Sequence, residues 1–167
     1  MAHIISDDKY VFFWKETGPN GFFSNWYPSP FIIDDFIYRD VEQYFMAQKA
    51  KLFHDAERYT EILRADQPWE YKDLGRLVTP FDPILWDENK YDIVKAGNRA
   101  KYAQNPGLKK ALLETGTKIL AEASPKDKIW GIGLDAPAAS ALAPFQWPGQ
   151  NLLGQILMEL RSEFSTH

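Results

Sequence analysis

Apolar side chains recur every three or four residues over much of this chain, which is the spacing of an amphipathic helix. Val41, Phe45 and Leu52 follow this spacing, and Met46 and Phe53 widen the same apolar stripe. The pattern predicts helices over residues 41–53, 55–65, 68–77, 88–104, 107–115 and 151–164. Short apolar and aromatic runs predict strands over 10–14, 31–33, 36–38 and 118–123. We therefore expect a predominantly helical α+β fold, with helices packed around a small sheet.

Turn-forming residues separate these elements. The acidic pair Asp34 and Asp35 stands between two short strands and predicts a hairpin with a two-residue turn. Residues 131–150 are rich in glycine, proline and alanine and predict a long loop, of a kind that is usually functional or disordered. The chain shows no internal repeat and no linker, so we expect a single domain over residues 1–167.

The helix predicted over 41–53 carries two charged residues in an apolar setting. Glu42 and Lys49 are seven residues apart, about two helical turns, so they lie on nearly the same line as Phe45 and Met46. Burying a charge is costly unless the charge is paired or used. The pattern therefore predicts either a structural ion pair or a catalytic pair, and this segment alone does not decide between them.

Composition excludes several classes of chemistry. The chain has no cysteine, which excludes thiolate zinc sites, Fe–S clusters, a cysteine nucleophile and disulfides. Its three histidines are scattered: His3 and His167 lie near the ends and His54 stands alone, which argues against a histidine metal site or a Ser-His-Asp triad. Acid–base chemistry must then use carboxylates, lysine, tyrosine or water, and we expect no metal and no cofactor.

Charge and hydropathy bear on location and partners. Because the sequence shows neither a signal-like N-terminal stretch nor a run of about 18 apolar residues, we expect a cytoplasmic or nuclear protein without a membrane segment. The net charge of -4 argues against a protein that grips duplex nucleic acid along its whole length. Residues 101–128 nevertheless hold six lysines against three acids. This strip is either a solvated helix face or a contact surface for phosphates.

Three further segments contain residues suited to binding. In residues 21–31, Ser24 and Asn25 lie in an aromatic, proline-rich loop. The Asn25 amide either forms hydrogen bonds with sugar hydroxyls or the edge of a base, or only forms hydrogen bonds within its own turn. In residues 122–135, Asp127 precedes Trp130 by three positions, which indicates either a ligand site or a tight turn with a core tryptophan. Asn151 is the predicted N-cap residue of the last helix. The N-terminus of this helix is also a candidate phosphate site.

Six segments of the sequence occur in the order and spacing of one known family. They are FFSNWYP, VEQYFMAQKA, GNRAKYAQN, LLETG, EASPKDKIWGIGL and WPGQNLLGQILMELR. In these blocks the chain resembles the NADAR family, also known by its YbiA-like members, from about Phe12 to Phe164. The resemblance implies a single, mostly helical α+β domain with N-glycosidase activity. Family members often have histidine after the glutamate of the helix motif, where this chain has Gln43, which puts a proton-relay role for that position in doubt.

The resemblance also assigns roles to residues of this chain. Glu42, Lys49 and Asp127 are the expected catalytic residues. The expected substrate-binding residues are Ser24, Asn25, Trp86, Lys101, Trp130, Gly131, Gly149 and Asn151. Breaking a C1′–N bond develops positive charge at C1′, so we expect Glu42 to stabilise it and orient the attacking water. Lys49 is expected to hold a phosphate or the Glu42 carboxylate.

Two substrates follow from the two branches of this family. One branch removes ADP-ribose from modified guanine in nucleic acid, and the other cleaves ribosylaminopyrimidine phosphates of early riboflavin synthesis. Because the lysine strip and the long loop suit a larger, phosphate-bearing substrate, we favour ADP-ribosylated nucleic acid as the partner over the phosphorylated small molecule. A non-catalytic ADP-ribose or nucleotide binder is the alternative from another class. We expect a monomer.

Overall fold

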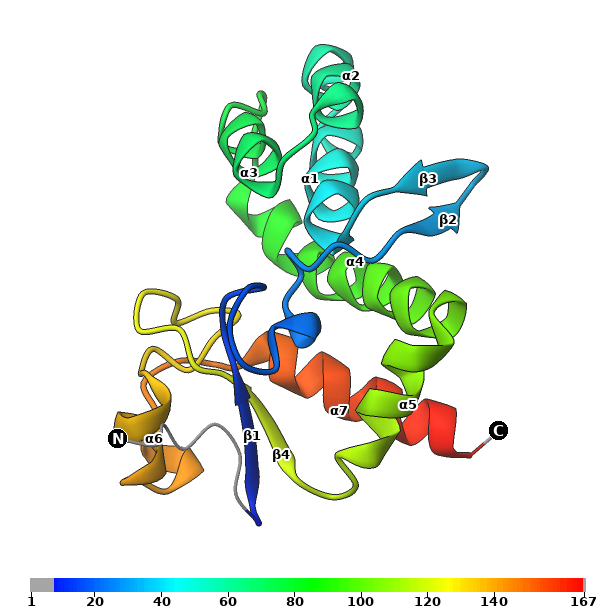
Figure 1. The fold of residues 1–167 in the computed structure, drawn as a ribbon. Helices are drawn as coiled ribbons and strands as arrows, with labels where there is room; N and C mark the ends of the chain where they lie inside the picture. The colour runs from blue at the N-terminus through cyan, green and yellow to red at the C-terminus, as the bar shows by residue number, and fades with distance from the viewer. Residues whose placement is uncertain (1–7, 167) are drawn as a thin grey trace. The chain divides into compact units, whose positions relative to one another are not determined.

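The computed structural model describes residues 8–166 of the chain, so His3 and His167 lie outside the described residues. Within this range the fold is α+β with helix predominating, which confirms the expected class (Figure 1). The described chain divides into two compact units. The terminal unit contains residues 8–27 and 106–166, and the central unit contains Pro28–Asn105. The expectation of a single domain over the whole chain stays a prediction.

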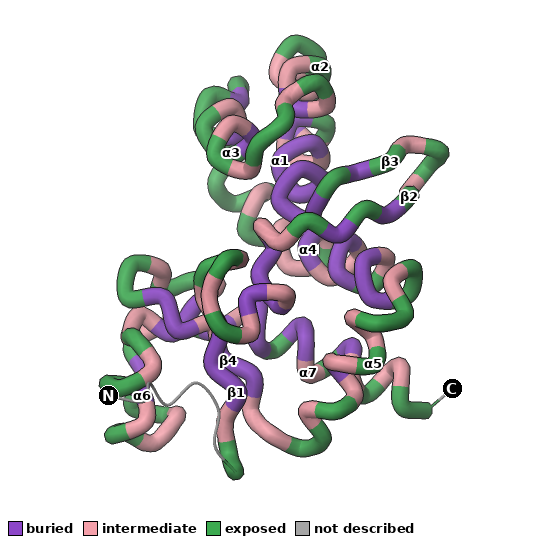
Figure 2. Tube along the Cα trace, viewed as in Figure 1, coloured by how far each residue is buried: buried purple, intermediate pink, exposed green. Residues whose placement is uncertain are grey.

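The central unit is built around α1 (Val41–Leu52), which packs against the three other helices of this unit. These are α2 (Ala56–Arg64), α3 (Pro68–Arg76) and α4 (Pro83–Gln104). A Cβ added to Gly97 of α4 would meet the Tyr44 ring at 2.8 Å, so glycine lets α4 approach α1 closely. Figure 2 shows buried positions along α1 and α4, where these two helices face one another.

The hairpin of the central unit pairs β2 (Phe31–Ile33) with β3 (Phe36–Tyr38) in antiparallel register. Asp34 and Asp35 have φ of 51° and 64°, the left-handed conformation that a two-residue hairpin turn requires. The Gln104 side chain accepts a hydrogen bond from Ile32 N–H (2.8 Å) and donates one to Ile32 C=O (2.9 Å). The predicted hairpin is confirmed, and α4 supports its outer edge.

The terminal unit contains a parallel pair of strands, β1 (Tyr10–Phe13) and β4 (Ile119–Glu122). The helix α7 (Leu152–Ser165) packs on β4 and on α5 (Pro106–Glu114). Buried residues Phe12, Ile132 and Trp147 belong to its apolar core. The Trp147 indole N–H donates to Ala139 C=O at 3.1 Å, which satisfies the polar atom of this core tryptophan.

Two stretches differ from the prediction by more than one residue at an end. α4 begins at Pro83 and not at residue 88, because Asp82 accepts hydrogen bonds from Ile84 N–H and Leu85 N–H and proline is favourable at a first helical position. The stretch 131–150 is not a structureless loop, because it contains α6 (Ala136–Ser140) and the 3₁₀ helix η2 (Pro144–Gln146). A second 3₁₀ turn, η1 (Gly21–Phe23), precedes the Ser-Asn segment.

Across residues 8–166, no helix combines the length and the apolar character needed to cross a bilayer. Over the same range, no three carboxylate or histidine side chains gather into a group that would hold a metal ion.

Candidate active site

The N-terminus of α1 places Glu42. Asp40 precedes the helix in an extended conformation, and its Oδ1 accepts a hydrogen bond from Gln43 N–H at 2.9 Å. This is an N-cap, which fixes where the helix begins. Glu42 follows in the first turn and is only 7% exposed. A carboxylate at the N-terminal end of a helix is favoured by the helix dipole, so this position suits an ionised acid.

Gln43 has a structural role in this arrangement. Its Oε1 accepts a hydrogen bond from Arg39 N–H at 2.8 Å, and its Nε2 donates to Ile62 C=O and Leu63 C=O at 3.2 and 3.4 Å. The buried amide therefore ties the start of α1 to the end of α2. The observed role of the Gln43 side chain is therefore to hold the start of α1 in place.

Lys49 lies two turns further along α1 and is half-buried. Burial is the main influence on its pKa and lowers it, the charge of Glu42 raises it, and Arg76 on α3 lowers it. The Glu42 carboxylate thus lies close enough to influence the Lys49 ammonium. The predicted acid and base therefore lie on one line of α1, and the charge of Glu42 favours the protonated form of Lys49.

Aromatic side chains surround Lys49. Its Nζ lies 4.9 Å from the centre of the Phe81 ring and 5.4 Å from that of Trp86. Trp86, in the first turn of α4, stacks on Phe45 with 5.1 Å between ring centres and 23° between ring planes. Trp86 is partly exposed, so it offers an aromatic surface beside the Glu42–Lys49 pair.

Lys101 is placed differently from the prediction. It lies on α4 and is completely buried, so its ammonium is not part of a surface strip of lysines. Burial lowers the pKa of Lys101 to about 7, and the charge of Asp40 opposes this shift. Burial in turn raises the pKa of Asp40 to about 7, while hydrogen bonds from backbone N–H groups and the charge of Lys101 oppose that shift. The predicted role of Lys101 in substrate binding stays a prediction.

Sequence reasoning did not find Asp40 as part of the site. A signal was present, because an aspartate directly before a helical apolar pattern marks an N-cap. The sequence could not show that this cap would be 3% exposed and close to a buried lysine 61 positions further along. Asp40 is therefore a buried titratable group, two residues before Glu42, that the structure adds to the residues predicted from the sequence.

The other predicted residues lie in the terminal unit, where polar side chains bond to the backbone. Asp127 Oδ1 accepts hydrogen bonds from Ile129 N–H and Trp130 N–H, both at 2.9 Å. Ser24 Oγ accepts one from Trp26 N–H at 3.1 Å, and both Ser24 and Asn25 are buried. Asp127 and Ser24 thus hold the turns in which they stand.

Gly149 and Asn151 fasten the loop before α7. Gly149 N–H donates to Ile132 C=O at 2.8 Å, and Asn151 N–H donates to Gly131 C=O at 3.0 Å. Asn151 stands at the N-cap position of α7, as predicted, but its side chain forms no capping hydrogen bond. It accepts from Glu122 N–H (3.1 Å) and donates to Leu120 C=O (2.9 Å), which joins the start of the helix to β4.

The N-terminus of α7 is occupied by backbone partners. Leu152 N–H and Leu153 N–H donate to Ile129 C=O and Trp130 C=O, both at 3.2 Å. The alternative of a phosphate held at this helix end is therefore not supported, because these two donors are already used.

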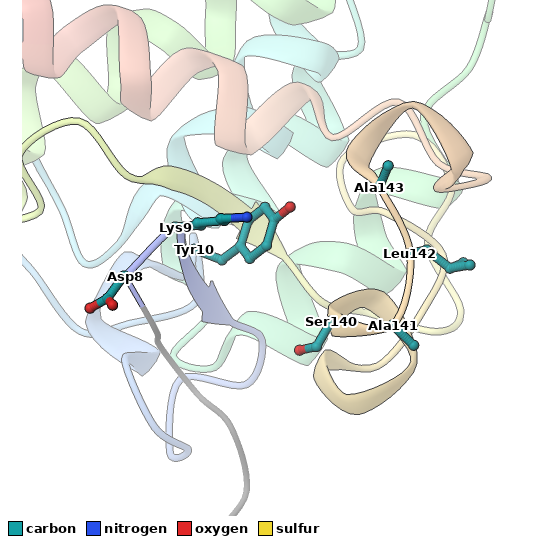
Figure 3. A pocket seen from close by; sticks show the side chains of 7 residues that line it. All are labelled: Asp8, Lys9, Tyr10, Ser140, Ala141, Leu142 and Ala143. Carbon is teal, nitrogen blue, oxygen red and sulfur yellow. The ribbon is translucent and has the colours of Figure 1, made fainter.

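The terminal unit also has a hollow of about 500 Å³, lined by residues 8–10 and 140–143. Figure 3 shows the Tyr10 ring and the Lys9 side chain on one side and residues 140–143 on the other. None of the predicted site residues lines this hollow, so it gives no support to their assignment.

Comparison with known proteins gives the family. The model of the NADAR domain matches residues 12–165. The chain belongs to the NADAR family. An N-glycosidase of Acanthamoeba polyphaga mimivirus is 48% identical to it, over 95% of this chain and 98% of the relative. The NMR structure of the E. coli protein YbiA matches with a TM-score of 0.79 and 30% identity, over 96% of this chain and 88% of that one.

A third relative has a different kind of name. A riboflavin biosynthesis protein of Vibrio vulnificus is 30% identical over 94% of this chain, which corresponds to 39% of that protein. The NADAR membership and the N-glycosidase relatives confirm the expected enzyme class, a hydrolase of N-glycosyl bonds.

Proposed function

We propose that the bond cleaved by this enzyme joins ADP-ribose to guanine in nucleic acid, and that Glu42 is the catalytic carboxylate. One observation carries the catalytic assignment. Glu42 is buried in the first turn of α1, two turns before Lys49 on the same helix, and the Lys49 ammonium lies against the rings of Phe81 and Trp86. An acid and a base in such surroundings are the groups that N-glycoside hydrolysis needs.

The chemistry follows from the charges that develop. As the C1′–N bond breaks, C1′ becomes positive and the leaving nitrogen gains the bonding electrons. In the proposed step the Glu42 carboxylate stabilises the positive charge at C1′ and orients the attacking water. The hydroxyl of that water bonds to C1′, and its proton ends on the leaving nitrogen. Lys49 holds either Glu42 or a phosphate of the substrate.

The base requires a flat apolar surface, and Trp86 provides one beside Lys49. Stacking of a base on an aromatic side chain contributes ~1–3 kcal/mol in nucleic-acid complexes. The roles of Asn25, Asp127 and Trp130 in binding the base or the ribose remain predictions, as do the monomeric state and a cytoplasmic or nuclear location.

The preference for the larger, phosphate-bearing substrate rests on the lysines between residues 109 and 128, which suit contacts with phosphates. The relatives carry names of both kinds: this chain matches the mimivirus N-glycosidase over 98% of that protein and the riboflavin biosynthesis protein over 39% of its length. The name of the Vibrio relative supports the second candidate, a ribosylaminopyrimidine phosphate.

A chromatographic assay that offers both substrates tests the proposal. The purified chain is incubated separately with an ADP-ribosylated guanine oligonucleotide and with ribosylaminopyrimidine phosphate, and Glu42→Gln is assayed in parallel. We expect the wild type to release ADP-ribose from the oligonucleotide and the variant to release none. Turnover of the pyrimidine alone would favour the second candidate. ADP-ribose binding without turnover, unchanged in Glu42→Gln, would identify a non-catalytic binder.

A further inference from the structure

Phe81 lies in the short connection between α3 and α4, and 47% of its surface is exposed. The connection is fixed on both sides of this residue. Thr79 N–H donates to Asp55 Oδ2 at 3.0 Å, and Asp82 Oδ1 accepts from Ile84 N–H at 2.9 Å where α4 begins. The Phe81 ring therefore has a defined place although much of it faces solvent.

The contacts of the Phe81 ring show how its position affects Lys49. The Lys49 ammonium lies 4.9 Å from the centre of the Phe81 ring and 5.4 Å from that of Trp86. Both distances fall within the ~6 Å over which the negative face of a ring attracts a cation. Phe53 packs 5.2 Å from Phe81 and 6.4 Å from Trp86, centre to centre, and supports both rings from α1's C-terminal end.

We propose that Phe81 is a positioning residue, which holds the Lys49 ammonium beside Trp86 and on the line of α1 that carries Glu42. The inference rests on the proposed function, since it concerns the same acid–base pair. A lysine side chain has four rotatable carbon–carbon links, and a half-buried ammonium needs a second contact to stay in one place. The strength of the interaction between the Lys49 ammonium and the Glu42 carboxylate depends on where the ammonium lies.

Besides the two rings, three factors affect the pKa of Lys49. Burial lowers its pKa, Glu42 on the same helix raises it, and Arg76 on α3 lowers it. A ring attracts only the protonated amine, so the Phe81 ring raises the pKa of Lys49, while the apolar cover that it also provides lowers it. Substitutions of Phe81 can separate the attraction between ring and ammonium from the effect of apolar cover on the pKa of Lys49.

The experiment measures the pKa of Lys49 from the pH dependence of its acylation by an amine-reactive reagent, read by peptide mass spectrometry. Phe81→Leu keeps the apolar cover and removes the ring, so the pKa should fall by about half a unit. Phe81→Ala admits water and should raise it, and Phe81→Tyr should restore the wild-type value. Phe145→Leu is the matched control, because Phe145 is 88% exposed and belongs to the terminal unit.

Kinetics complete the test. Phe81→Leu should lower kcat by about 2- to 5-fold at little cost in KM, with rescue by Phe81→Tyr. An unchanged Lys49 pKa and an unchanged kcat in Phe81→Leu would overturn the inference. If that variant fails to fold, Phe81→Met provides a second ring-free side chain. The acylation measurement needs no substrate, so inactivity of the wild type towards both substrates would count against the proposed function and not against the role of Phe81.

Discussion

Predicted site residues behave differently in the two units of this protein. In the terminal unit, Asp127 and Asn151 form hydrogen bonds to backbone groups of nearby loops and of β4. In the central unit, Glu42 and Lys101 are buried ionisable groups, and burial shifts the pKa of Lys101 strongly. Side chains of the first kind fix the course of the chain, whereas groups of the second kind carry a free-energy cost that is typical of functional sites.

This difference shows which of the predicted site residues have a purely structural explanation and which do not. A polar residue in a glycine- and proline-rich segment has a sufficient explanation when its side chain satisfies the local backbone. A glutamate and a lysine on the apolar face of a buried helix have no such local explanation. The catalytic assignment is therefore best supported in the central unit, and the following substitutions test the contrast.

The largest effect is expected from Glu42→Gln. The amide keeps the size of the side chain but removes the negative charge, so kcat should fall by ~10²–10⁴-fold while the melting temperature stays close to that of the wild type. Glu88→Gln on the exposed side of α4 is the control and should change neither quantity. A wild-type rate in folded Glu42→Gln would remove Glu42 from the mechanism.

Lys101→Met tests the buried pair. Near pH 7, where both groups are partly ionised, it removes the neighbouring positive charge from the buried Asp40 carboxylate, which should lower the free energy of unfolding by about 1–3 kcal/mol. The double variant with Asp40→Asn should recover most of this loss, because asparagine keeps the N-cap and carries no charge. Lys51→Met, at an exposed position, is the control.

The pH dependence of these variants has a definite sign. The pKa of Asp40 is raised to about 7, so the stability that its protonated form provides is present below about pH 4 and is lost as the pH rises through 7. The pKa of Lys101 is lowered to about 7, so its contribution is present above about pH 10.5 and is lost as the pH falls through 7. Urea unfolding of Lys101→Met should show only the first trend, and a flat profile would contradict it.

Asn151→Ala should lower the free energy of unfolding by about 1–3 kcal/mol, since Glu122 N–H and Leu120 C=O lose their partner. Asn151 has φ of 54°, so Asn151→Gly is the matched comparison that tolerates this conformation and removes only the side-chain bonds. A lower kcat per folded molecule in both variants would support the predicted substrate role of Asn151.

The smallest effect on stability is expected from Asp127→Asn, below about 0.5 kcal/mol, because the amide oxygen can accept the same two N–H groups. Asp127→Ala removes the acceptor and should cost about 1–3 kcal/mol. If Asp127→Asn loses activity at an unchanged melting temperature, the carboxylate acts on the substrate as predicted. If activity is unchanged, the side chain only holds its turn.

Much of the local structure was predictable because it depends on neighbouring residues. The acidic pair Asp34–Asp35 marked the hairpin turn, and the apolar stripe of 41–53 located α1 to within one residue at its end. The start of α4 was missed because its first turn has no apolar repeat, and only the Asp82 cap and Pro83 reveal it. α6 was missed because alanine and proline in a short segment also fit a loop.

The sequence alone determined the helical character of the chain, its NADAR resemblance and the placement of Glu42 and Lys49 on one helix line, because spacing along a helix is a local property. Only the tertiary structure decided that Lys101 is buried near Asp40, that Asn151 bonds to β4, and that Phe81 lies against Lys49. These contacts join residues that are far apart in the sequence, and burial and partner choice depend on how whole elements pack.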